Sequence, residues 1–504
     1  TLRSGLFHSS VRRHIVNVVA DERGCKRNRT HPAHVRSNSR VGFPKGPDLE
    51  QSEGVVMIKT ASYTVPVAGL ATLLALCASA GAYTWNVSTV AELQNAVENY
   101  TSGDEIVMAA GTYDNTQLTT QGKWLHFDRD DVVLRGATGD PDDVVMTGPG
   151  MNKNAYPKEI VIVDADDVTV RDLSLGECKW NGVHIRGEND TDRAWIYNVA
   201  TFNVGERHIK ASTNQDDINA ISDDVLVEFV HMSQNKARQG SDYIGGIDGM
   251  GVRNWTIRDS VADSVKGTGG GGRGGIFLWQ GVSNCTAERN LIIGCDRGIA
   301  YGNPASPSHI FAGDHHSDGG IIRNNFVVRG AGIALELAFT KDLKVYHNTV
   351  YSDDCSYFRT VHIYDGAGET TNLQFAYNII RGQISENATG DWSYTGDITG
   401  CTPAGNWFVD PLNGDLHLTG SATAAIDHGS PLADVTDDYD QEARDSTPDI
   451  GADEIGESPP PTVEFDLVSS NGSESAASVD LAVSLSNSSD QTVTVDYAVT
   501  GGTA

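Results

Sequence analysis

Between residues 246 and 380 the chain repeats one short segment in which apolar and polar positions alternate. Alternation with a period of two predicts β-strands that bury one face. One Asn or Ser holds the same place in each copy, and successive copies lie 30, 35, 23 and 30 residues apart. The copies are Trp255–Val261, Cys285–Leu291, Ile321–Val327, Lys344–Val350 and Gln374–Ile380, aligned on Ser260, Asn290, Asn325, Asn348 and Asn378. The pattern predicts a fixed strand followed by insertions of variable length.

A second motif, usually a Gly followed by an aliphatic residue, alternates with the first. Its copies are Gly182–His184, Gly246–Asp248, Gly275–Phe277, Gly298–Ala300, Gly332–Ala334 and, with Thr in place of Gly, Thr360–His362. Two short strands per repeat cannot bury an apolar face alone, but stacked coils can. A β-propeller would need about four strands in ~40–45 residues. We therefore predict an all-β fold, a right-handed parallel β-helix built as a single-stranded solenoid.

The recurring Asn predicts a ladder along one turn of the coils. Asn tolerates left-handed backbone, and its amide can bond the coils above and below. Upstream, the segment from Thr89 to Asn99 predicts a short amphipathic helix behind a Ser88/Thr89 cap. Its apolar residues at helical spacing are Val90, Leu93, Ala96 and Val97. We expect this helix to cover the open end of the first coil.

The two ends of the chain differ from the repeats. Residues 1–56 are basic and lack apolar periodicity, which indicates an upstream segment rather than a domain. Lys59, the apolar run Val65–Leu76 and the small residues Ala80–Ala82 predict a signal peptide over 57–82, and hence a secreted or cell-surface protein. We expect the β-helix to span 83–456, followed by a Pro-rich linker at 457–461. In residues 462–504 apolar and polar positions alternate again, which predicts strands that form part of a β-sandwich.

Export changes the charge balance. Residues 1–82 carry 11 of the 37 Lys/Arg and 5 of the 67 Asp/Glu, so the exported part has a net charge of −36. Such a surface argues against nucleic acid or an anionic membrane as partner, and we expect no membrane span in the exported chain.

Calcium is the candidate cofactor, at Asp164–Asp167 or at Asp223 and Asp224, although solvated loop acids are an equal alternative. We expect a monomer within a larger modular protein.

Five cysteines remain after export: Cys178, Cys285, Cys295, Cys355 and Cys401. Their number is odd and their spacing irregular. Buried thiols inside the coil are the simplest interpretation, with one or two disulfides as the alternative in an exported protein.

Strand geometry predicts which side chains face outward beside the aliphatic residue of the second motif. The predicted outward set is polar, basic and aromatic: His184, Arg186, His208, Lys210, Asp248, Met250, Phe277, Trp279, Ala300, Ala334, Glu336, His362 and Tyr364. Coils stack ~4.8 Å apart, so we expect Lys210 beside Asp248 and His184 ~10 Å from Asp248. We expect Arg207, Arg273 and Arg297 in adjacent loops. A purely structural explanation is a cross-coil ion pair between Lys210 and Asp248.

The start of the predicted β-helix resembles a known cap. The motifs Leu93–Val97, Gly103–Val107 and Gly111–Tyr113 are similar to the N-terminal cap of the pectate-lyase-like superfamily, notably its alginate lyase and chondroitinase B family. The likeness covers about residues 85–456. It implies β-elimination on acidic polysaccharides. The family's catalytic Arg and Lys positions match Trp279 and Met250 here, so both family residues are replaced.

Two further resemblances concern the C-terminal part. Asn406–Pro411, Gly414–Leu418 and Pro448–Asp453 resemble the closing segment of secreted bacterial β-helix proteins. Residues 462–504 are similar to the first half of a Calx-beta domain, which implies an incomplete sandwich.

β-Elimination of a uronate requires a base, a group that neutralises the carboxylate and an acid for the leaving oxygen. Lys210 or His208 is the candidate base, Arg186 or Arg207 the neutraliser and His184 the proton donor, with Asp248 beside them. Candidate substrate-binding residues are Trp279, Arg273, Arg297, Glu336, His362 and Tyr364. The Gly-rich loop 267–273 and the insertion 303–318 favour a binding function. In that insertion, His315, His316 and Asp318 form a possible metal site, although adjacent loop histidines are usually solvent-facing.

The most favoured function is thus a secreted polysaccharide lyase acting on an acidic glycan. One alternative is a non-catalytic carbohydrate-binding or adhesive surface protein. A second is an inverting glycoside hydrolase, which would need Asp248 paired with Asp216 or Asp217.

Overall fold

The computed structural model describes residues 82–214, 217, 220–236, 238–305 and 315–455, together with two short strands at 463–465 and 483–485. The predicted upstream segment, nearly all of the predicted signal peptide and the Pro-rich linker lie outside these residues. So does most of the Calx-beta-like segment. Within it, β39 (Val463–Phe465) and β40 (Val483–Leu485) pair antiparallel.

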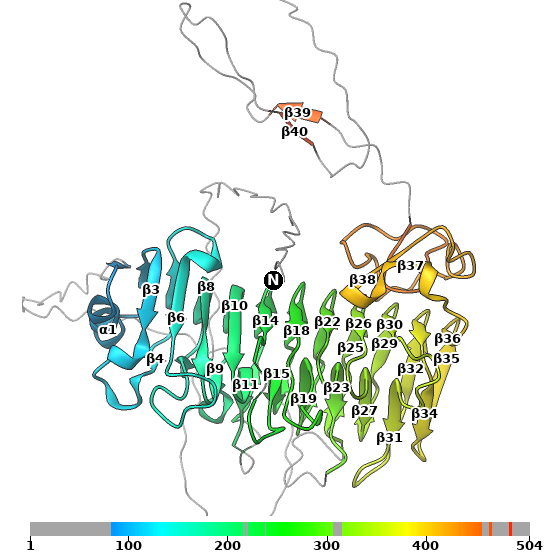
Figure 1. The fold of residues 1–504 in the computed structure, drawn as a ribbon, viewed down its shortest axis with the longest axis horizontal. Coiled ribbons are helices and arrows are strands. Elements are labelled where there is room, and N and C mark those ends of the chain that lie inside the picture. Colours follow the sequence, from blue (N-terminus) through cyan, green and yellow to red (C-terminus); the bar gives the residue numbers. More distant parts are fainter. Residues whose placement is uncertain are drawn as a thin grey trace, which may run out of the picture. The chain divides into compact units, whose positions relative to one another are not determined.

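Each turn of the solenoid has three walls and a short bridge. One coil comprises β13 (Leu226–Glu228), β14 (His231–Ser233), β15 (Gly245–Met250) and β16 (Val252–Arg253), and the next coil begins at β17 (Thr256–Arg258). Equivalent strands of successive coils pair in parallel, as Leu226 with Thr256 and Ile247 with Ile276 show. Figure 1 shows the coils following one another in sequence order from blue to yellow. The predicted parallel β-helix is confirmed.

The three walls and the bridge form three sheets, which we call A, B and C. Sheet A has 21 strands in two stacks that share β8 and β10. Its first stack is β1 (Thr84–Val87), β2 (Glu105–Met108), β5 (Val133–Gly136), β8 (Thr169–Cys178), β10 (Trp195–Val204), β13, β17, β21 (Thr286–Glu288), β25 (Ile321–Arg323), β29 (Lys344–Tyr346), β32 (Leu373–Ala376) and β35 (Trp392–Thr395). Its second is β3 (Gly111–Asp114), β6 (Val144–Thr147), β8, β10, β14, β18 (Val261–Asp263), β22 (Leu291–Ile293), β26 (Phe326–Val328), β30 (Thr349–Tyr351), β33 (Ile379–Arg381) and β36 (Ile398–Gly400).

Sheet B is the third wall, and sheet C is the bridge. Sheet B contains β4 (Leu125–Phe127), β7 (Val161–Val163), β9 (Asn181–Arg186), β11 (Arg207–Ser212), β15, β19 (Ile276–Trp279), β23 (Ile299–Gly302), β27 (Leu335–Ala338), β31 (Val361–Tyr364) and β34 (Ile384–Asn387). Sheet C contains β12 (Ser222–Asp223), β16, β20 (Val282–Ser283), β24 (Ser317–Asp318) and β28 (Thr340–Lys341). Short 3₁₀ turns lie at Asn115–Gln117, Gln121–Lys123, Pro141–Asp143, Gly187–Asn189, Gly405–Trp407 and Pro411–Asn413.

The Asn ladder is present, but its backbone differs from the prediction. The first repeat motif is two strands, not one, and they meet at the ladder position. The residue before each ladder side chain has the left-handed conformation: Asp259, Arg289, Asn324, His347 and Tyr377 all have φ between 49° and 54°. The ladder Asn residues do not, so the prediction of left-handed Asn is wrong. Their side-chain amides are needed instead to hydrogen-bond the buried backbone at the turn between the two strands, as Asn348 does with the Ile322 carbonyl.

The N-terminal end of the core is covered as predicted. Helix α1 (Val90–Asn99) begins at Thr89, whose side chain and that of Glu92 form a reciprocal capping box. Its apolar face inserts Leu93 and Ala96 into the core, and both are fully buried. Without this helix the first coil would expose strand edges and apolar side chains to water. No helix in the described ranges has the length and apolarity to cross a membrane.

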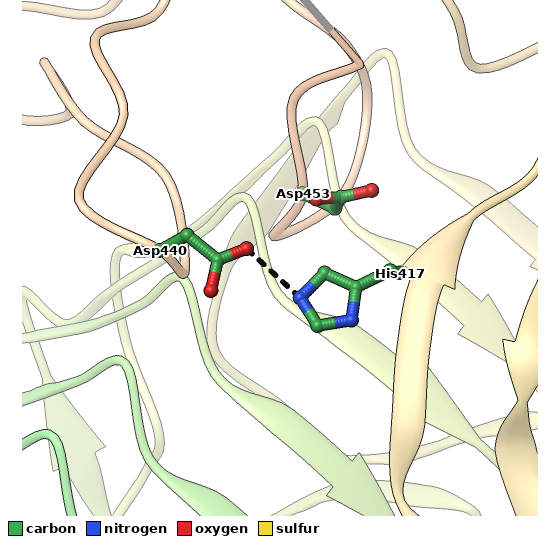
Figure 2. A group of neighbouring side chains, drawn as sticks. All are labelled: His417, Asp440 and Asp453. Atoms are coloured by element: carbon green, nitrogen blue, oxygen red, sulfur yellow. Dashed lines mark hydrogen bonds and ion pairs between the residues drawn. The ribbon is translucent and has the colours of Figure 1, made fainter. Parts of the chain in front are cut away.

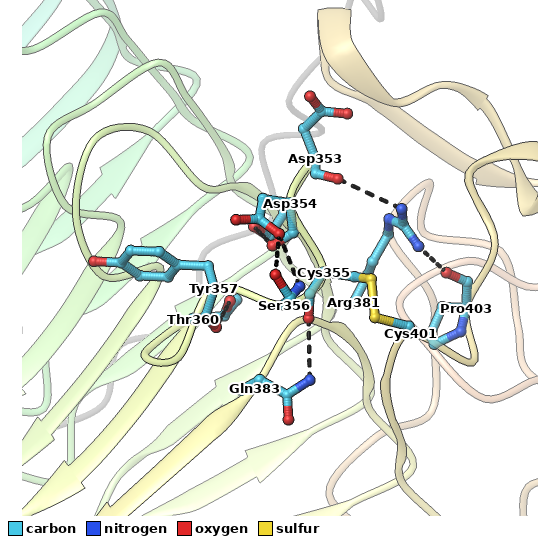
Figure 3. Close-up of a disulfide and its surroundings, with 11 residues drawn as sticks. Asp353, Asp354, Cys355, Ser356, Tyr357, Thr360, Arg381, Gln383, Cys401 and Pro403 are labelled. Carbon is cyan, nitrogen blue, oxygen red and sulfur yellow. Dashed lines mark hydrogen bonds between the residues drawn. A yellow bond between two sulfur atoms is a disulfide. The ribbon is translucent and has the colours of Figure 1, made fainter.

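A disulfide joins two segments beside the last coils, and residues 403–455, which we call the closing segment, pack against Phe326, Tyr351 and Ile379 of sheet A. Figure 3 shows Cys355 joined to Cys401, 46 residues apart in sequence. Nearby, Arg381 donates to the Pro403 carbonyl over 2.7 Å. The other three thiols, Cys178, Cys285 and Cys295, are free and buried, so buried thiols and one disulfide coexist. In the closing segment, β37 (Phe408–Asp410) and β38 (Asp415–Leu418) form an antiparallel hairpin.

Candidate functional site

The predicted outward stripe lies on sheet B. In the register of the strands, Lys210 of β11 lies between His184 of β9 and Asp248 of β15, and Phe277 of β19 follows Asp248. A second row on the same face aligns Arg186 with Ser212 and Met250 with Trp279. The expected neighbourhood of Lys210 and Asp248 is therefore confirmed, with their side chains 3.2 Å apart.

Asp248 is the centre of this stripe and is fully buried. Its carboxylate forms ion pairs with Arg207 and Lys210 and accepts the Trp279 indole N–H over 2.9 Å. Burial alone would raise the pKa of Asp248, but the two cations outweigh it and the pKa is lowered. The carboxylate thus stays ionised and positions its three partners. A buried carboxylate held in this way is neither a free base nor a protonated acid.

Lys210 combines burial with one charge partner. Its side chain is 9% exposed, and burial lowers the pKa of the ammonium although Asp248 opposes the shift. The contact with Asp248 leaves Nζ without a well-angled hydrogen bond in the described residues. A lysine with a lowered pKa is suited to accept a proton.

Arg207 does not lie in a loop, contrary to the prediction. It is the first residue of β11 and is 1% exposed. Its guanidinium pairs with Asp248, donates to the Glu206 carbonyl over 3.0 Å and lies 4.0 Å from the centre of the Tyr243 ring. These contacts occupy Arg207, which leaves it poorly placed to neutralise a substrate carboxylate.

His208 points into the coil, so its predicted outward orientation is wrong. It is fully buried and shares a 2.8 Å hydrogen bond with Thr201. Burial lowers its pKa to about 3, which keeps the ring neutral. The equivalent Gly182 explains the error, because a Cβ at Gly182 would meet Leu175 and Val204 of the core. The position before the aliphatic residue faces inward at this bend of the chain.

His184 lies in a chain of hydrogen bonds. Its Nδ1 is 2.8 Å from Glu159 and its Nε2 is 2.7 Å from Ser212, whose hydroxyl donates in turn to Glu188. The single proton of Ser212 goes to Glu188, so Nε2 must be the donor to the Ser212 oxygen. The imidazole thus lies between the Glu159 carboxylate and the Ser212 hydroxyl, in a chain that continues to Glu188.

The sequence reading missed three members of this network. Ser212 lies two residues after Lys210, so strand alternation places it on the same face and could have found it. Glu159 and Glu188 lie outside the sheet B strands, before β7 and after β9. No periodicity in the sequence marks these two glutamates, since only the fold brings Glu159 to His184 and Glu188 to Ser212.

Arg186 remains available for a ligand. It is partly exposed, it aligns with Ser212 on the neighbouring coil, and its Nε has no hydrogen-bond partner in the described residues. Diagonal neighbours on adjacent strands lie ~7–8 Å apart, so Arg186 and Lys210 are within reach of one sugar residue.

Two loops border this cluster. Gly269 of the Gly-rich insertion donates its N–H to Asp242 over 2.6 Å. A Cβ at Gly267 would come within 2.4 Å of Asp242 Oδ1, so the close approach of the two loops requires glycine there. Arg273, at the end of this insertion, lies 5.8 Å from the centre of the Phe277 ring. Phe277 and Trp279 stack with ring centres 5.3 Å apart.

Farther along sheet B, a second polar cluster contains the other predicted substrate-binding residues. Glu336 pairs with Arg297 over 2.5 Å and accepts the Tyr364 hydroxyl. His362 aligns with Glu336 and stacks on Tyr364 with ring centres 4.0 Å apart. Burial, helped by Glu336, raises the pKa of Tyr364, and burial lowers the pKa of His362. The cluster lies three coils from Asp248, about 14 Å along the sheet.

The predicted metal ligands of the 303–318 insertion are not brought together. His316 is fully buried; its Nδ1 accepts the Gln280 N–H and its Nε2 contacts the Ala305 carbonyl. Asp318 lies 3.4 Å from Lys341, and His315 packs against Phe339. His309 lies outside the described residues.

The predicted calcium clusters are occupied by protein side chains. Asp164 contacts His126 and Asn189, and Arg193 spans Asp166 and Asp167. Asp223 pairs with Arg253, and Asp224 with Asn254. For the hydrolase alternative, Asp216 lies outside the described residues, and the carboxylate of Asp248 is held by its three partners.

Comparison with known proteins gives matches among solved structures alone. No protein-family model and no curated protein matches the chain. An alginate lyase from Paenibacillus sp. str. FPU-7 has 16% sequence identity and a TM-score of 0.34, covering 63% of this chain and 99% of its own. Pectate lyase Pel9A has 13% identity and a TM-score of 0.40, covering 75% and 97%. The catalytic unit of an α-1,3-glucanase from Streptomyces thermodiastaticus strain HF3-3 has 14% identity and a TM-score of 0.34, covering 64% and 71%.

Proposed function

We propose that this protein is a polysaccharide lyase that cleaves a uronate-containing glycan by β-elimination. One observation carries the proposal. A lysine of lowered pKa, a partly exposed arginine and a hydrogen-bonded histidine lie on adjacent coils of one sheet face. These are the base, the neutralising group and the acid that the reaction needs.

Each group has a defined step. Arg186 binds the uronate carboxylate and stabilises the negative charge that develops when C5 loses its proton. Lys210 Nζ, in its unprotonated form, takes that proton. The electron pair forms the C4–C5 double bond as the C4–O bond breaks. The leaving oxygen receives a proton from the His184–Ser212 pair. Asp248 positions Lys210 and Trp279 and touches no reacting atom.

Two observations support these role assignments over the alternatives. His208 faces the core, which favours Lys210 as the base, and the contacts of Arg207 favour Arg186 as the neutraliser. Lys210 and Arg207 pair with Asp248, and His184 contacts Glu159, so Arg186 is the stripe cation that meets the substrate carboxylate. Because charges are screened beyond ~8 Å at physiological salt, Arg186 acts on a bound uronate more strongly than distant surface acids do.

A non-catalytic glycan-binding surface is the second candidate. The observation that favours it is the burial of Lys210 against Asp248, which also serves as a structural ion pair. The partly exposed rings of Trp279 and Tyr364, each stacked on a buried ring, offer flat faces to sugars in either case.

Export of the protein is also a proposal, based on the leader-like segment before residue 83. The Cys355–Cys401 disulfide supports it, since disulfides persist mainly in oxidising compartments. Calcium stays a candidate cofactor, to be tested with the activity.

The test is ultraviolet absorbance of the unsaturated uronate product. The full chain is incubated with alginate, pectate, chondroitin and hyaluronan, with calcium or with a chelator. A lyase increases the absorbance with one of them, and Arg186→Ala loses most of the activity while Lys341→Ala, on sheet C, retains it. Glycan binding without product would establish the second candidate. New reducing ends without the absorbance would establish hydrolysis and reject the proposed chemistry.

A further inference from the structure

The closing segment carries a His and two Asp residues whose ligand atoms converge. His417 of β38, Asp440 and Asp453 each offer one ligand atom, and these atoms all lie within 4.8 Å of one another in the described residues. Figure 2 shows the three side chains on three separate pieces of the chain, with Asp440 directed at the His417 ring. The group lies beside sheet A, where Phe326 of β26 contacts the His417 ring, and is therefore separate from the sheet B stripe.

The imidazole is held in the orientation of a metal ligand. Its Nε2 lies 2.9 Å from Asp440, and its Nδ1 lies 2.7 Å from Asp415. The Phe326 and Tyr439 rings pack edge-on against it, with centres at 5.0 and 5.7 Å. Metal-binding histidines usually direct their second nitrogen to a carboxylate, which fixes the ring.

Asp453 supplies the independent observation that points to a cation. It is 6% exposed, and its Oδ2 accepts the Leu418 N–H over 2.6 Å. Within the described residues its other oxygen has no hydrogen-bond donor, and no basic side chain lies within ion-pairing distance. One backbone hydrogen bond occupies only part of what a carboxylate can accept, so Asp453 keeps an oxygen for a cation on the side where His417 and Asp440 lie.

We propose that His417, Asp440 and Asp453 bind one divalent transition-metal ion, for which Zn²⁺ is the best match. An imidazole ligand disfavours Ca²⁺ and Mg²⁺, which prefer all-oxygen sites. Zn²⁺ binds imidazole and carboxylate at about 2.0–2.2 Å in tetrahedral geometry, which puts ligand atoms about 3.4 Å apart. Small side-chain rotations bring the three atoms to that spacing, and water completes the fourth position.

The bound ion links three parts of the closing segment, which packs against the coils. His417 comes from the hairpin, Asp440 from the loop after it and Asp453 from the end of the segment. The loop next to Asp440 contacts the coils through Asp437, which lies 2.8 Å from Arg289. Near Asp453, the Ala452 N–H donates to Thr349 of β30 over 2.9 Å. The inference concerns stability and does not depend on the proposed lyase activity.

Calorimetric titration of Zn²⁺ into the chelator-treated full chain tests the site, alongside thermal unfolding with and without Zn²⁺. The expected result is one equivalent of Zn²⁺ bound and a higher melting temperature. His417→Gln and Asp453→Asn weaken binding at least tenfold and lose the thermal shift. The matched control His428→Gln, an exposed His in the same segment, retains both. Circular dichroism of the metal-free variants separates loss of binding from loss of fold.

Co²⁺ supplies a second readout, because Co²⁺ bound by a tetrahedral nitrogen and oxygen site absorbs visible light. The spectrum is expected in the wild type and in His428→Gln, and not in His417→Gln. Absence of a stoichiometric Zn²⁺ site overturns the proposal and leaves His417 as an ion-pair partner of Asp415 and Asp440. Unchanged Zn²⁺ affinity in both ligand variants also overturns it. Stabilisation by Ca²⁺ and not by Zn²⁺ through the same residues rejects the assigned metal class.

Discussion

The Asn ladder and the stripe on sheet B are both columns of polar side chains repeated from coil to coil, yet they differ in kind. In the ladder, the oxygens of Asn325, Asn348 and Asn378 accept the N–H and side-chain amide of the Asn one coil earlier, as Asn348 does from Asn325 over 3.1 and 2.9 Å. The four Asn residues of the ladder are identical, neutral and fully buried. In the stripe, the aligned residues are His184, Lys210, Asp248 and Phe277, all different. A column of identical Asn side chains satisfies the hydrogen bonds of the buried backbone. A column in which the residue type changes from coil to coil can instead bring different chemical groups together in one site.

We expect the largest effect from a substitution that changes the stripe and leaves the ladder intact. Lys210→Met keeps the aliphatic stem and removes the proposed base, so we expect kcat/KM on the responsive glycan to fall by about 10²–10⁴-fold. The urea midpoint should change little, because Asp248 keeps Arg207 and Trp279 as partners. Lys341→Met, outside sheet B, is the control and should keep full activity. Equal loss in both variants, or none in Lys210→Met, would assign the stripe a structural role.

The converse change breaks the ladder and leaves the stripe intact. Asn348→Ala removes three donated and two accepted hydrogen bonds in the core. The groups left unpaired cost about 1–3 kcal/mol each, partly relieved by relaxation, so we expect the free energy of unfolding to fall by about 3–5 kcal/mol. Urea titration measures it. Asn413→Ala, exposed in the closing segment, should cost less than about 1 kcal/mol. A similar small cost for Asn348→Ala would contradict a structural ladder.

The coils at the C-terminal end of both columns can be destabilised by removing the disulfide beside them. The Cys355–Cys401 bond closes a loop of about 46 residues beside the last coils. Replacing both cysteines by Ser should lower the free energy of unfolding by about 2–4 kcal/mol, because the unfolded chain regains the entropy of an open loop. Reductant should shift the wild type toward the variant's urea midpoint and leave the variant unchanged. If reductant has no effect on the wild type, the disulfide does not stabilise these coils.

We expect the smallest effect from the ionisable group at the end of the otherwise neutral Asn ladder. The ladder ends on Asp397, which accepts the Asn378 N–H and side-chain amide over 2.9 and 2.7 Å. Burial raises the pKa of Asp397 to about 6, so the folded protein binds a proton more tightly than the unfolded chain. This stabilisation is complete below about pH 4 and is lost as the pH rises through 6.

Asp397→Asn removes that dependence. Relative to the wild type, its free energy of unfolding should therefore increase by about 1–3 kcal/mol between pH 4 and pH 7. Urea titrations of both proteins across this range measure the difference. A difference independent of pH would mean that Asp397 titrates normally and that the ladder tolerates a charge at its end.

The sequence by itself determined the coil. The alternating segments, their spacing and the Asn positions predicted the parallel β-helix and its ladder, and the motif around Thr89 predicted the capping helix, because these features depend on local periodicity and on contacts repeated in every coil. The same periodicity placed Lys210 beside Asp248 correctly.

The tertiary structure alone decided which of these residues are free to act. His208 faces the core because its strand bends where other coils carry Gly, and Arg207 is enclosed by Asp248 and Tyr243 from two other segments. Glu159 reaches His184 and Glu188 reaches Ser212 from outside the sheet B strands, and His417, Asp440 and Asp453 meet across a hairpin and two loops. Such meetings depend on the paths of loops whose lengths vary from coil to coil, so no period in the sequence encodes them.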